Sequence, residues 1–235
     1  FMLRVMSAFT PVTHVIFDLD GLLVDTERVY TEAFEKACAA FGVVYIIKWK
    51  ADHMGMKHDP AIEVVLARSG LAGRVSIADF SVVYDAYLDS HLADAALLPG
   101  ADKLIRHLVH HKIPIAICTG SGDEDYAVKV RKHAVITENI RLSVRCSSDP
   151  AIGKGKPAPD CFLVTASRFE QPPSSPDRVL VFEDSVNGAL AGLAAGMQVV
   201  MVLDPENVSP EQRRATLVLD SLCDFVPELF GLPPY

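Results

Sequence analysis

The chain has 235 residues, half of them apolar and 22% charged, which is ordinary for a globular protein and excludes a disordered or collagen-like chain. Its 30 acidic and 22 basic side chains give a formal net charge of −8, and an acidic protein repels nucleic-acid phosphates and anionic lipids. We therefore expect neither nucleic acid nor a membrane surface as a partner.

The N-terminus and the cysteines favour a cytoplasmic protein. Residues 1–9 are too short and too interrupted by Arg4 and Ser7 for a signal sequence, and no apolar run reaches the roughly 20 residues of a membrane span. The five cysteines are odd in number, widely spaced and without a CxxC pair. This pattern argues against a disulfide framework and against a zinc site, and a reducing cytosol fits it best.

Short apolar runs predict the strands of the fold. Nearly continuous runs of this kind suit strands that are buried on both faces of a parallel sheet. The runs cover residues 13–18, 113–118, 178–182 and 198–202. Helical patterns lie between them, one opened by Pro99 and Gly100 and one closed by Gly196. The alternation predicts an α/β fold with a doubly wound, mostly parallel, Rossmann-like sheet.

A helical segment interrupts this alternation directly after the first strand. We expect a helix over 26–41, a second helix capped by Asp59 and closed by Gly70, and a third over 78–93. These helices are numerous enough to bury a small core of their own. We therefore predict a helical cap at 25–96, inserted into an α/β core made of 1–24 and 97–235.

Polar residues follow the predicted strands. Asp18 and Asp20 end the first strand, and alternation along an extended chain places both carboxylates on one side. Thr119, Gly120 and Ser121 end the second, where a hydroxyl and small residues can present N–H groups to a phosphate oxygen. Each signal alone is weak, because such residues also occur in ordinary turns and helix caps.

Two more signals follow further along the chain. Lys156 stands in a glycine- and proline-rich stretch, GKGKPAPD, and we expect a third core strand just before it. Glu183 and Asp184 end the fourth strand, at the edge where α/β proteins bind ligands. The order of acid pair, hydroxyl, lysine and acid pair is far more specific than any one of its parts.

Read as DLDGLLVDTE, TGS, GKPAPD and FEDS, this set resembles the signature of the haloacid dehalogenase-like hydrolases. The resemblance spans nearly the whole chain, since the helical insertion is similar to the small cap of that family. DGLLVDTE, the Met54–Gly55 pair, FEDSVNG and the final PELFGLPPY most resemble its pseudouridine-5′-phosphatase branch. The resemblance implies a phosphatase that acts on a small phosphorylated metabolite.

The resemblance also implies roles for the motif residues. Asp18 would be the nucleophile that forms a phosphoaspartyl intermediate, and Asp20 would be the general acid and base. Lys156 and the Thr119 hydroxyl would hold the transferring oxygens.

A divalent cation is needed to bring a carboxylate to a phosphate dianion. Mg²⁺ prefers oxygen ligands, and we expect them from Asp18, the Asp20 carbonyl and Asp184, with Glu183 orienting a bound water.

The substrate is the least defined part of the expectation. The resemblance favours pseudouridine 5′-phosphate as the substrate, with glycerol 3-phosphate or a sugar phosphate as alternatives. The residues expected to contact the substrate are Gly55, Lys57, Gly120 and Ser121. A sugar phosphomutase is disfavoured because Tyr30 stands where we align a histidine of those enzymes. A non-catalytic phospholigand-binding protein is disfavoured by the intact acid pairs. We expect a monomer.

Overall fold

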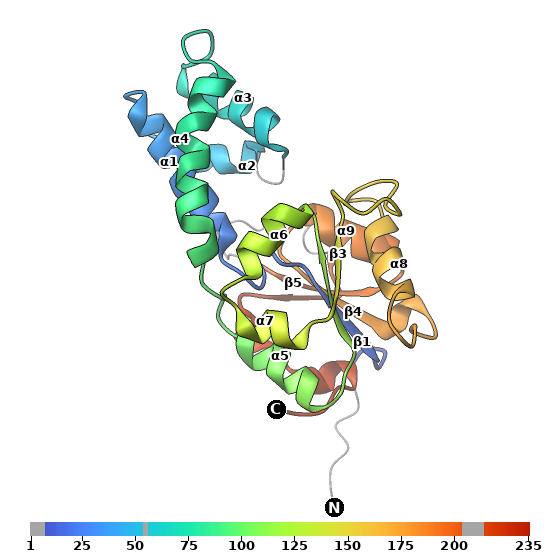
Figure 1. Cartoon of the computed structure of the whole chain (residues 1–235). Helices are drawn as coiled ribbons and strands as arrows, with labels where there is room; N and C mark the ends of the chain where they lie inside the picture. The colour runs from blue at the N-terminus through green and yellow to red at the C-terminus, as the bar shows by residue number, and fades with distance from the viewer. Residues whose placement is uncertain (1–7, 54–55, 204–213) are drawn as a thin grey trace, which may run out of the picture. The chain divides into compact units, whose positions relative to one another are not determined.

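The computed structural model describes residues 8–53, 56–203 and 214–235 (Figure 1). Contacts within the chain divide it into two compact units. The core unit comprises residues 1–24 and 97–235, and the helical unit comprises residues 25–96.

The described part of the core unit is built on a parallel sheet of six strands. Their order across the sheet is β3-β2-β1-β4-β5-β6. The strands are β1 (His14–Phe17), β2 (Ile115–Thr119), β3 (Leu142–Arg145), β4 (Val179–Glu183), β5 (Gln198–Val202) and β6 (Leu217–Leu219). Every residue of β1, β2 and β4 is buried, as expected for apolar strands that are covered on both faces.

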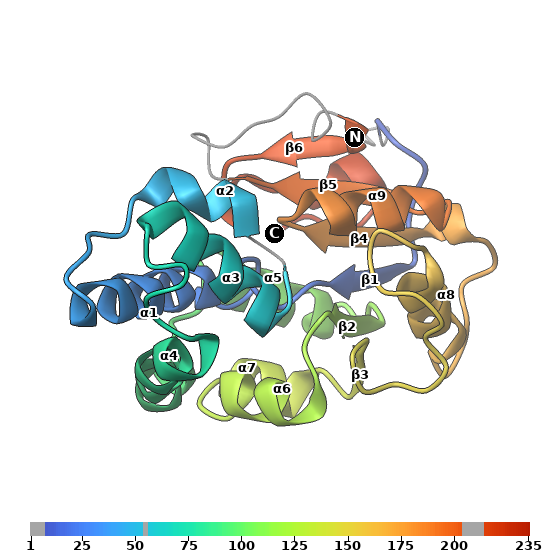
Figure 2. The ribbon, with the colours of Figure 1, turned by 90° about the horizontal axis from the view of Figure 1, so that it is seen from above.

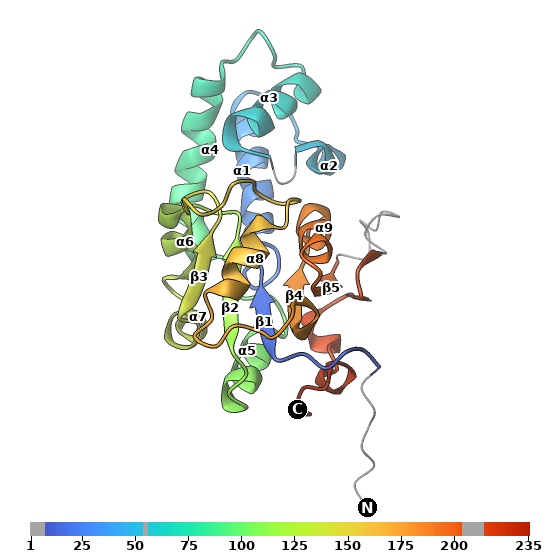
Figure 3. The ribbon, with the colours of Figure 1, turned by 90° about the vertical axis from the view of Figure 1, so that its right-hand side faces the viewer.

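Helices cover both faces of the sheet. They are α5 (Ala101–His110), α6 (Asp123–Val130), α7 (Ala134–Asn139), α8 (Asp160–Ser167) and α9 (Val186–Ala194). Figure 2 shows α5 and α7 on one side of the strands and α8 and α9 on the other, and Figure 3 shows α8 and α9 from their own side. This arrangement confirms the predicted doubly wound α/β fold.

The predicted strands at 13–18, 113–118, 178–182 and 198–202 are present, with ends shifted by up to two residues. β3 and β6 have no counterpart among the apolar runs. β3 alternates apolar residues with Ser143 and Arg145, and its side chains are mostly half-buried. It ends well before Lys156 rather than directly before it, because a long loop follows. Edge strands of this kind lack the continuous apolar run on which the prediction relied.

Aromatic rings attach the C-terminal segment to the centre of the core unit. Phe17 of β1 stacks on Phe182 of β4, with ring centroids 5.2 Å apart. Phe225 lies edge-on to Phe182 at 4.9 Å and in turn stacks on Phe230 at 5.8 Å. All four side chains are fully buried, so the C-terminal segment is part of the core.

The helical unit has a hydrophobic core of its own. Its helices are α1 (Thr26–Ala40), α2 (Lys50–His53), α3 (His58–Ser69) and α4 (Ile77–His91). Phe34 of α1, Ile62 of α3 and Phe80 of α4 meet in this core. Within the described ranges, no helix has the length and apolar character that crossing a membrane requires.

The expectation that Asp59 caps the second helix is wrong. α3 begins one residue earlier, at His58, and its N-cap position is held by Lys57, whose side chain makes no capping hydrogen bond. The Asp59 carboxylate instead lies 2.6 Å from the His58 ring nitrogen Nδ1. The closing residue is as predicted, since Gly70 takes a left-handed conformation that favours glycine.

Candidate active site

Three neighbouring strands of the core unit end beside one another. β1 lies between β2 and β4, and because all three are parallel their carboxyl ends share one edge of the sheet. Asp18 directly follows β1, Thr119 is the last residue of β2, and Glu183 is the last residue of β4. All three side chains are buried. The fold therefore brings together polar residues that lie far apart in the sequence.

Lys156 joins two of these strand ends. It reaches the edge from the loop between β3 and α8, and only 11% of its side chain is exposed. Its Nζ atom donates hydrogen bonds to Asp18 Oδ1 at 2.5 Å, to Glu183 Oε1 at 2.5 Å and to the Cys118 carbonyl at 3.0 Å. The three bonds use all three N–H groups of the ammonium.

Burial dominates the electrostatics of Asp18. It raises the pKa of the Asp18 carboxyl to about 7 despite the nearby Lys156 ammonium, and the negative charges of Glu183 and Asp20 raise it further. For Lys156 burial alone would lower the pKa, but Asp18 and Glu183 outweigh it and the pKa is raised. The lysine is therefore charged, and it balances only part of the negative charge at this edge.

The acidic residues at the edge can hold a cation. Asp18, Glu183 and Asp184 each offer a carboxylate oxygen, and these oxygens lie within 4.8 Å of one another. A cluster made only of oxygen donors fits Mg²⁺, which prefers such ligands.

The Asp20 carboxylate is held by a separate set of donors. Its Oδ2 accepts hydrogen bonds from Thr119 Oγ1 at 3.1 Å and Ser121 Oγ at 2.9 Å. Its Oδ1 lies 2.7 Å from Nζ of Lys129 in α6, and the same ammonium donates to Ser121 Oγ at 2.7 Å. Thr119 thus points to Asp20 in this structure. The side chains of Thr119, Ser121 and Lys129 together define the position of the Asp20 carboxylate.

Sequence reasoning missed Lys129. Its side chain is only 3% exposed, which is unusual for a lysine without a structural or functional reason. α6 spans two turns, so its apolar pattern is too short to show which of its positions face inward. Only the approach of α6 to β1 in the fold reveals that this lysine faces Asp20.

The remaining predicted residues are placed as follows. The Gly120 carbonyl accepts a hydrogen bond of 2.6 Å from the Ser147 hydroxyl. Lys57 is exposed in the helical unit, and Gly55 lies outside the described residues. The acidic run at 123–125 forms the first turn of α6, where negative side chains favour a helix N-terminus.

Gly188 in α9 allows the close packing of Glu183. A Cβ atom at this position would lie 1.9 Å from Glu183 Cδ and 2.0 Å from both carboxylate oxygens. The Gly188 amide also donates to the hydroxyl of Ser185, the N-cap of α9, and that hydroxyl donates to Glu183 Oε2 at 3.0 Å. The first turn of α9 therefore holds the carboxylate in place.

We predict that Gly188→Ala lowers the free energy of unfolding by about 1–3 kcal/mol, as overpacking of a core does, because the new methyl group displaces the Glu183 carboxylate. Chemical denaturation measures this change. Gly155→Ala is the matched control, since a Cβ at that exposed glycine meets no atom within 4 Å. Equal stability of the two variants would contradict the close packing.

Comparisons with known proteins find similar phosphatases over nearly the whole chain. A (DL)-glycerol-3-phosphatase 2 of Arabidopsis thaliana is 42% identical over 95% of this chain and 93% of its own length. A probable pseudouridine-5′-phosphatase of Drosophila melanogaster is 42% identical over 95% of this chain and 96% of its own.

Among solved structures, a HAD family hydrolase of Deinococcus radiodurans R1 with bound phosphate and sodium is 26% identical. It superposes with a TM-score of 0.80, covering 96% of this chain and all of that one. The family model described as haloacid dehalogenase-like hydrolase matches residues 12–196. These matches confirm the resemblance seen in the sequence: the chain belongs to the haloacid dehalogenase-like hydrolase family.

Proposed function

We propose that this hydrolase is a Mg²⁺-dependent phosphatase of small phosphorylated metabolites, with pseudouridine 5′-phosphate as its preferred substrate. One observation carries the assignment. The buried carboxylate of Asp18 is bonded to the Lys156 ammonium, while Asp20 lies two residues further on, held by separate donors. This arrangement offers a nucleophile, a cation for phosphate oxygens and a group that transfers protons. The phosphatase names of the two similar proteins support it.

Mg²⁺ would be held by Asp18, Asp184 and the backbone carbonyl of Asp20, with Glu183 orienting a water bound to it. Glu183 is suited to the outer role because Lys156 and Ser185 already occupy its oxygens. When bound, the ion supplies the positive charge that lets a carboxylate approach a phosphate dianion.

In the first step, an Asp18 carboxylate oxygen attacks phosphorus. The bond from that oxygen to phosphorus forms while the bond from phosphorus to the ester oxygen breaks. Lys156 stabilises the charge on the transferring oxygens, and Asp20 donates its proton to the leaving oxygen. The products of this step are the free alcohol and an aspartyl phosphate on Asp18.

In the second step, Asp20, now ionised, takes a proton from water, and the water oxygen attacks the phosphorus of the aspartyl phosphate. The bond from phosphorus to Asp18 breaks, which restores the Asp18 carboxylate and releases inorganic phosphate. Thr119, Ser121 and Lys129 keep Asp20 in one position through both steps.

The core motifs address only the phosphate, so we assign substrate choice to the helical unit. Gly55 and Lys57 would contact the rest of the substrate, while Gly120 and Ser121 would contact the phosphate. We place the enzyme in the cytoplasm as a monomer.

Glycerol 3-phosphate is the second candidate substrate. The Arabidopsis glycerol-3-phosphatase and the Drosophila probable pseudouridine-5′-phosphatase are equally similar to this chain, at 42% identity. A panel of phosphate esters therefore decides between them. It includes pseudouridine and uridine 5′-phosphates, glycerol 3-phosphate and hexose phosphates, ranked by kcat/KM with Mg²⁺. A clear preference for pseudouridine 5′-phosphate over uridine 5′-phosphate is expected; equal values would refute the substrate assignment but not the phosphatase.

We predict that Asp18→Asn abolishes turnover without loss of stability. The substitution removes the nucleophile, yet it leaves Lys156 paired with Glu183, so no buried ammonium is left alone. Activity is measured with a generic aryl phosphate, and thermal unfolding is followed both in EDTA and, in separate samples without EDTA, with Mg²⁺. Mg²⁺ should raise the Tm of the natural protein more than that of the variant, because a ligand of the ion is lost.

The same variant has a pH signature. The folded-state pKa of Asp18 is raised from 3.8 to about 7, so between these values the folded protein keeps a proton that the unfolded chain has released. The contribution of Asp18 to stability therefore falls as pH rises through this window. In EDTA, the Tm of Asp18→Asn minus the Tm of the natural protein should increase as the pH rises from 3.8 to about 7. A variant that keeps turnover, or a Tm difference that does not change with pH, would be inconsistent with this account.

We predict that Lys129→Met lowers kcat by about 100-fold, at the low end of what a general acid or base contributes, because Asp20 loses the ammonium that holds it. Lys129→Arg should restore part of the rate. Lys132→Met is the matched control, since it removes an exposed lysine just after α6. If Lys129→Met and Lys132→Met have the same kcat, Lys129 plays no part in positioning Asp20.

A further inference from the structure

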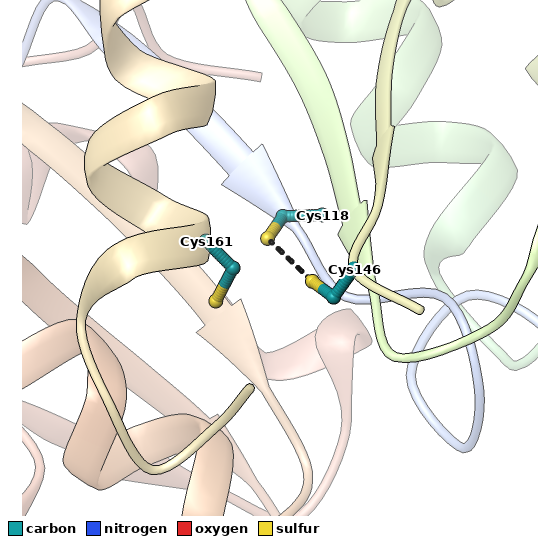
Figure 4. Close-up of side chains that lie close together, drawn as sticks. All are labelled: Cys118, Cys146 and Cys161. Atoms are coloured by element: carbon teal, nitrogen blue, oxygen red, sulfur yellow. Dashed lines mark hydrogen bonds between the residues drawn. The ribbon is translucent and has the colours of Figure 1, made fainter. Parts of the chain in front are cut away.

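Three of the five cysteines meet beneath the active-site edge of the core unit. Figure 4 shows Cys118, Cys146 and Cys161 with their sulfur atoms gathered between β2, the end of β3 and α8. Cys118 belongs to β2, Cys146 follows β3 directly, and Cys161 is in the first turn of α8. Spacing in the sequence argued against a zinc site, because these cysteines are separated by 27 and 14 residues (146 − 118 − 1 and 161 − 146 − 1).

The distances between the sulfur atoms fit a metal ion. The three Sγ atoms lie within 4.8 Å of one another, and those of Cys118 and Cys146 are 3.9 Å apart. Three sulfurs that each lie about 2.3 Å from one ion are separated by about 4.0 Å in a planar arrangement and by about 3.8 Å in a tetrahedral one. The cluster is therefore close to the geometry of three thiolate ligands before any ion is bound.

The surroundings of the cluster also suit an ion. Cys118 and Cys161 are buried, whereas Cys146 is half-buried and offers a route from solvent. A divalent ion with three thiolates carries a net charge of −1. The Lys156 ammonium donates to the Cys118 carbonyl at 3.0 Å and so lies beside the cluster, but its charge is already shared by Asp18 and Glu183.

A disulfide fits this cluster less well. Cys118 and Cys146 would have to approach from 3.9 Å to about 2.05 Å, and the third sulfur would be left out. The pKa of the Cys146 and Cys161 thiols is raised to about 12, and that of Cys118 is raised mainly by burial. Protonated thiols react slowly with oxidants, and because a metal ion binds the thiolate, the same raised pKa values make metal binding at this cluster increase with pH.

We infer that Cys118, Cys146 and Cys161 form a binding site for one thiophilic metal ion of the Zn²⁺ and Cd²⁺ class. Binding replaces three S–H bonds with three sulfur–metal bonds and releases three protons to solvent. All three ligands are sulfur, so the site prefers a soft ion and is chemically distinct from the all-oxygen cluster at Asp18, Glu183 and Asp184. The inference does not depend on the proposed phosphatase activity.

Titration with Cd²⁺ tests the site directly. The full chain is kept reduced and saturated with Mg²⁺, so that the oxygen cluster is occupied, and the sulfur-to-cadmium charge-transfer absorption is recorded. We expect one Cd²⁺ per chain and displacement of the signal by Zn²⁺. Cys146→Ser and Cys161→Ser should each weaken binding by at least about tenfold, since losing a ligand costs no less than losing an outer partner of a ligand.

The two remaining cysteines supply the controls. Cys223→Ser changes an exposed cysteine outside the cluster, and Cys38→Ala changes one in the helical unit, so both should retain the full signal. Circular dichroism checks that each variant is folded, and Cys146→Ala repeats the test should the serine variant unfold. As a second measure, Cd²⁺ should raise the Tm of the natural protein and not that of the Cys146 variant.

The inference is overturned by any of three results. The first is a cadmium signal that is absent or that survives in the Cys146 and Cys161 variants, which would mean that the thiols only fill the core. The second is loss of the signal in Cys223→Ser. The third is a protein purified without reductant that shows three free thiols, five less the two of a disulfide, which would mean that the cluster is a redox pair.

Discussion

The ammonium of Lys156, placed between the buried carboxylates of Asp18 and Glu183, is the interaction on which the proposed active site depends. Two carboxylates at this depth repel each other strongly, because the interior screens charge poorly. A lysine that donates to both makes their proximity tolerable, and two carboxylates with one ammonium still leave an excess of negative charge. This excess of negative charge suits the divalent cation that we propose for the site.

Neighbouring groups hold the carboxylates of Glu183 and Asp20 in place rather than react. Gly188 leaves room for the Glu183 carboxylate, and Ser185 both caps α9 and donates to that carboxylate. On the other side of β1, Thr119 and Lys129 hold Asp20. The carboxylates of Glu183 and Asp20 are therefore fixed by hydrogen bonds from helices and strands of the core unit. A site needs such support in order to present reacting groups in one geometry.

Much of the core unit could be predicted from the sequence, because its central strands are buried on both faces and read as continuous apolar runs. β3 was expected before Lys156 but not located, because it alternates apolar and polar residues, and β6 escaped prediction because its apolar run is only three residues long. The N-cap of α3 was misassigned because an aspartate before a proline is a common capping signal, while in the fold Asp59 pairs with the His58 ring instead. The same His58 ring lies 3.0 Å from Asp85 of α4 through its Nε2 atom, and this tertiary contact competes with the local capping preference of Asp59.

The sequence by itself determined the family, the fold class and the acidic and hydroxyl motifs at the ends of β1, β2 and β4, because each of these motifs directly follows or ends a strand that is recognisable as an apolar run; Lys156, which follows a long loop after β3, was identified from the motif order alone. Only the tertiary structure decided that Lys129 faces Asp20 and that Cys118, Cys146 and Cys161 share one cluster. These residues belong to segments that are separate in the chain, and their spacing in the sequence does not predict the distances between their side chains in the fold. That distance is set by how α6 and α8 pack on the sheet, which depends on the whole core at once.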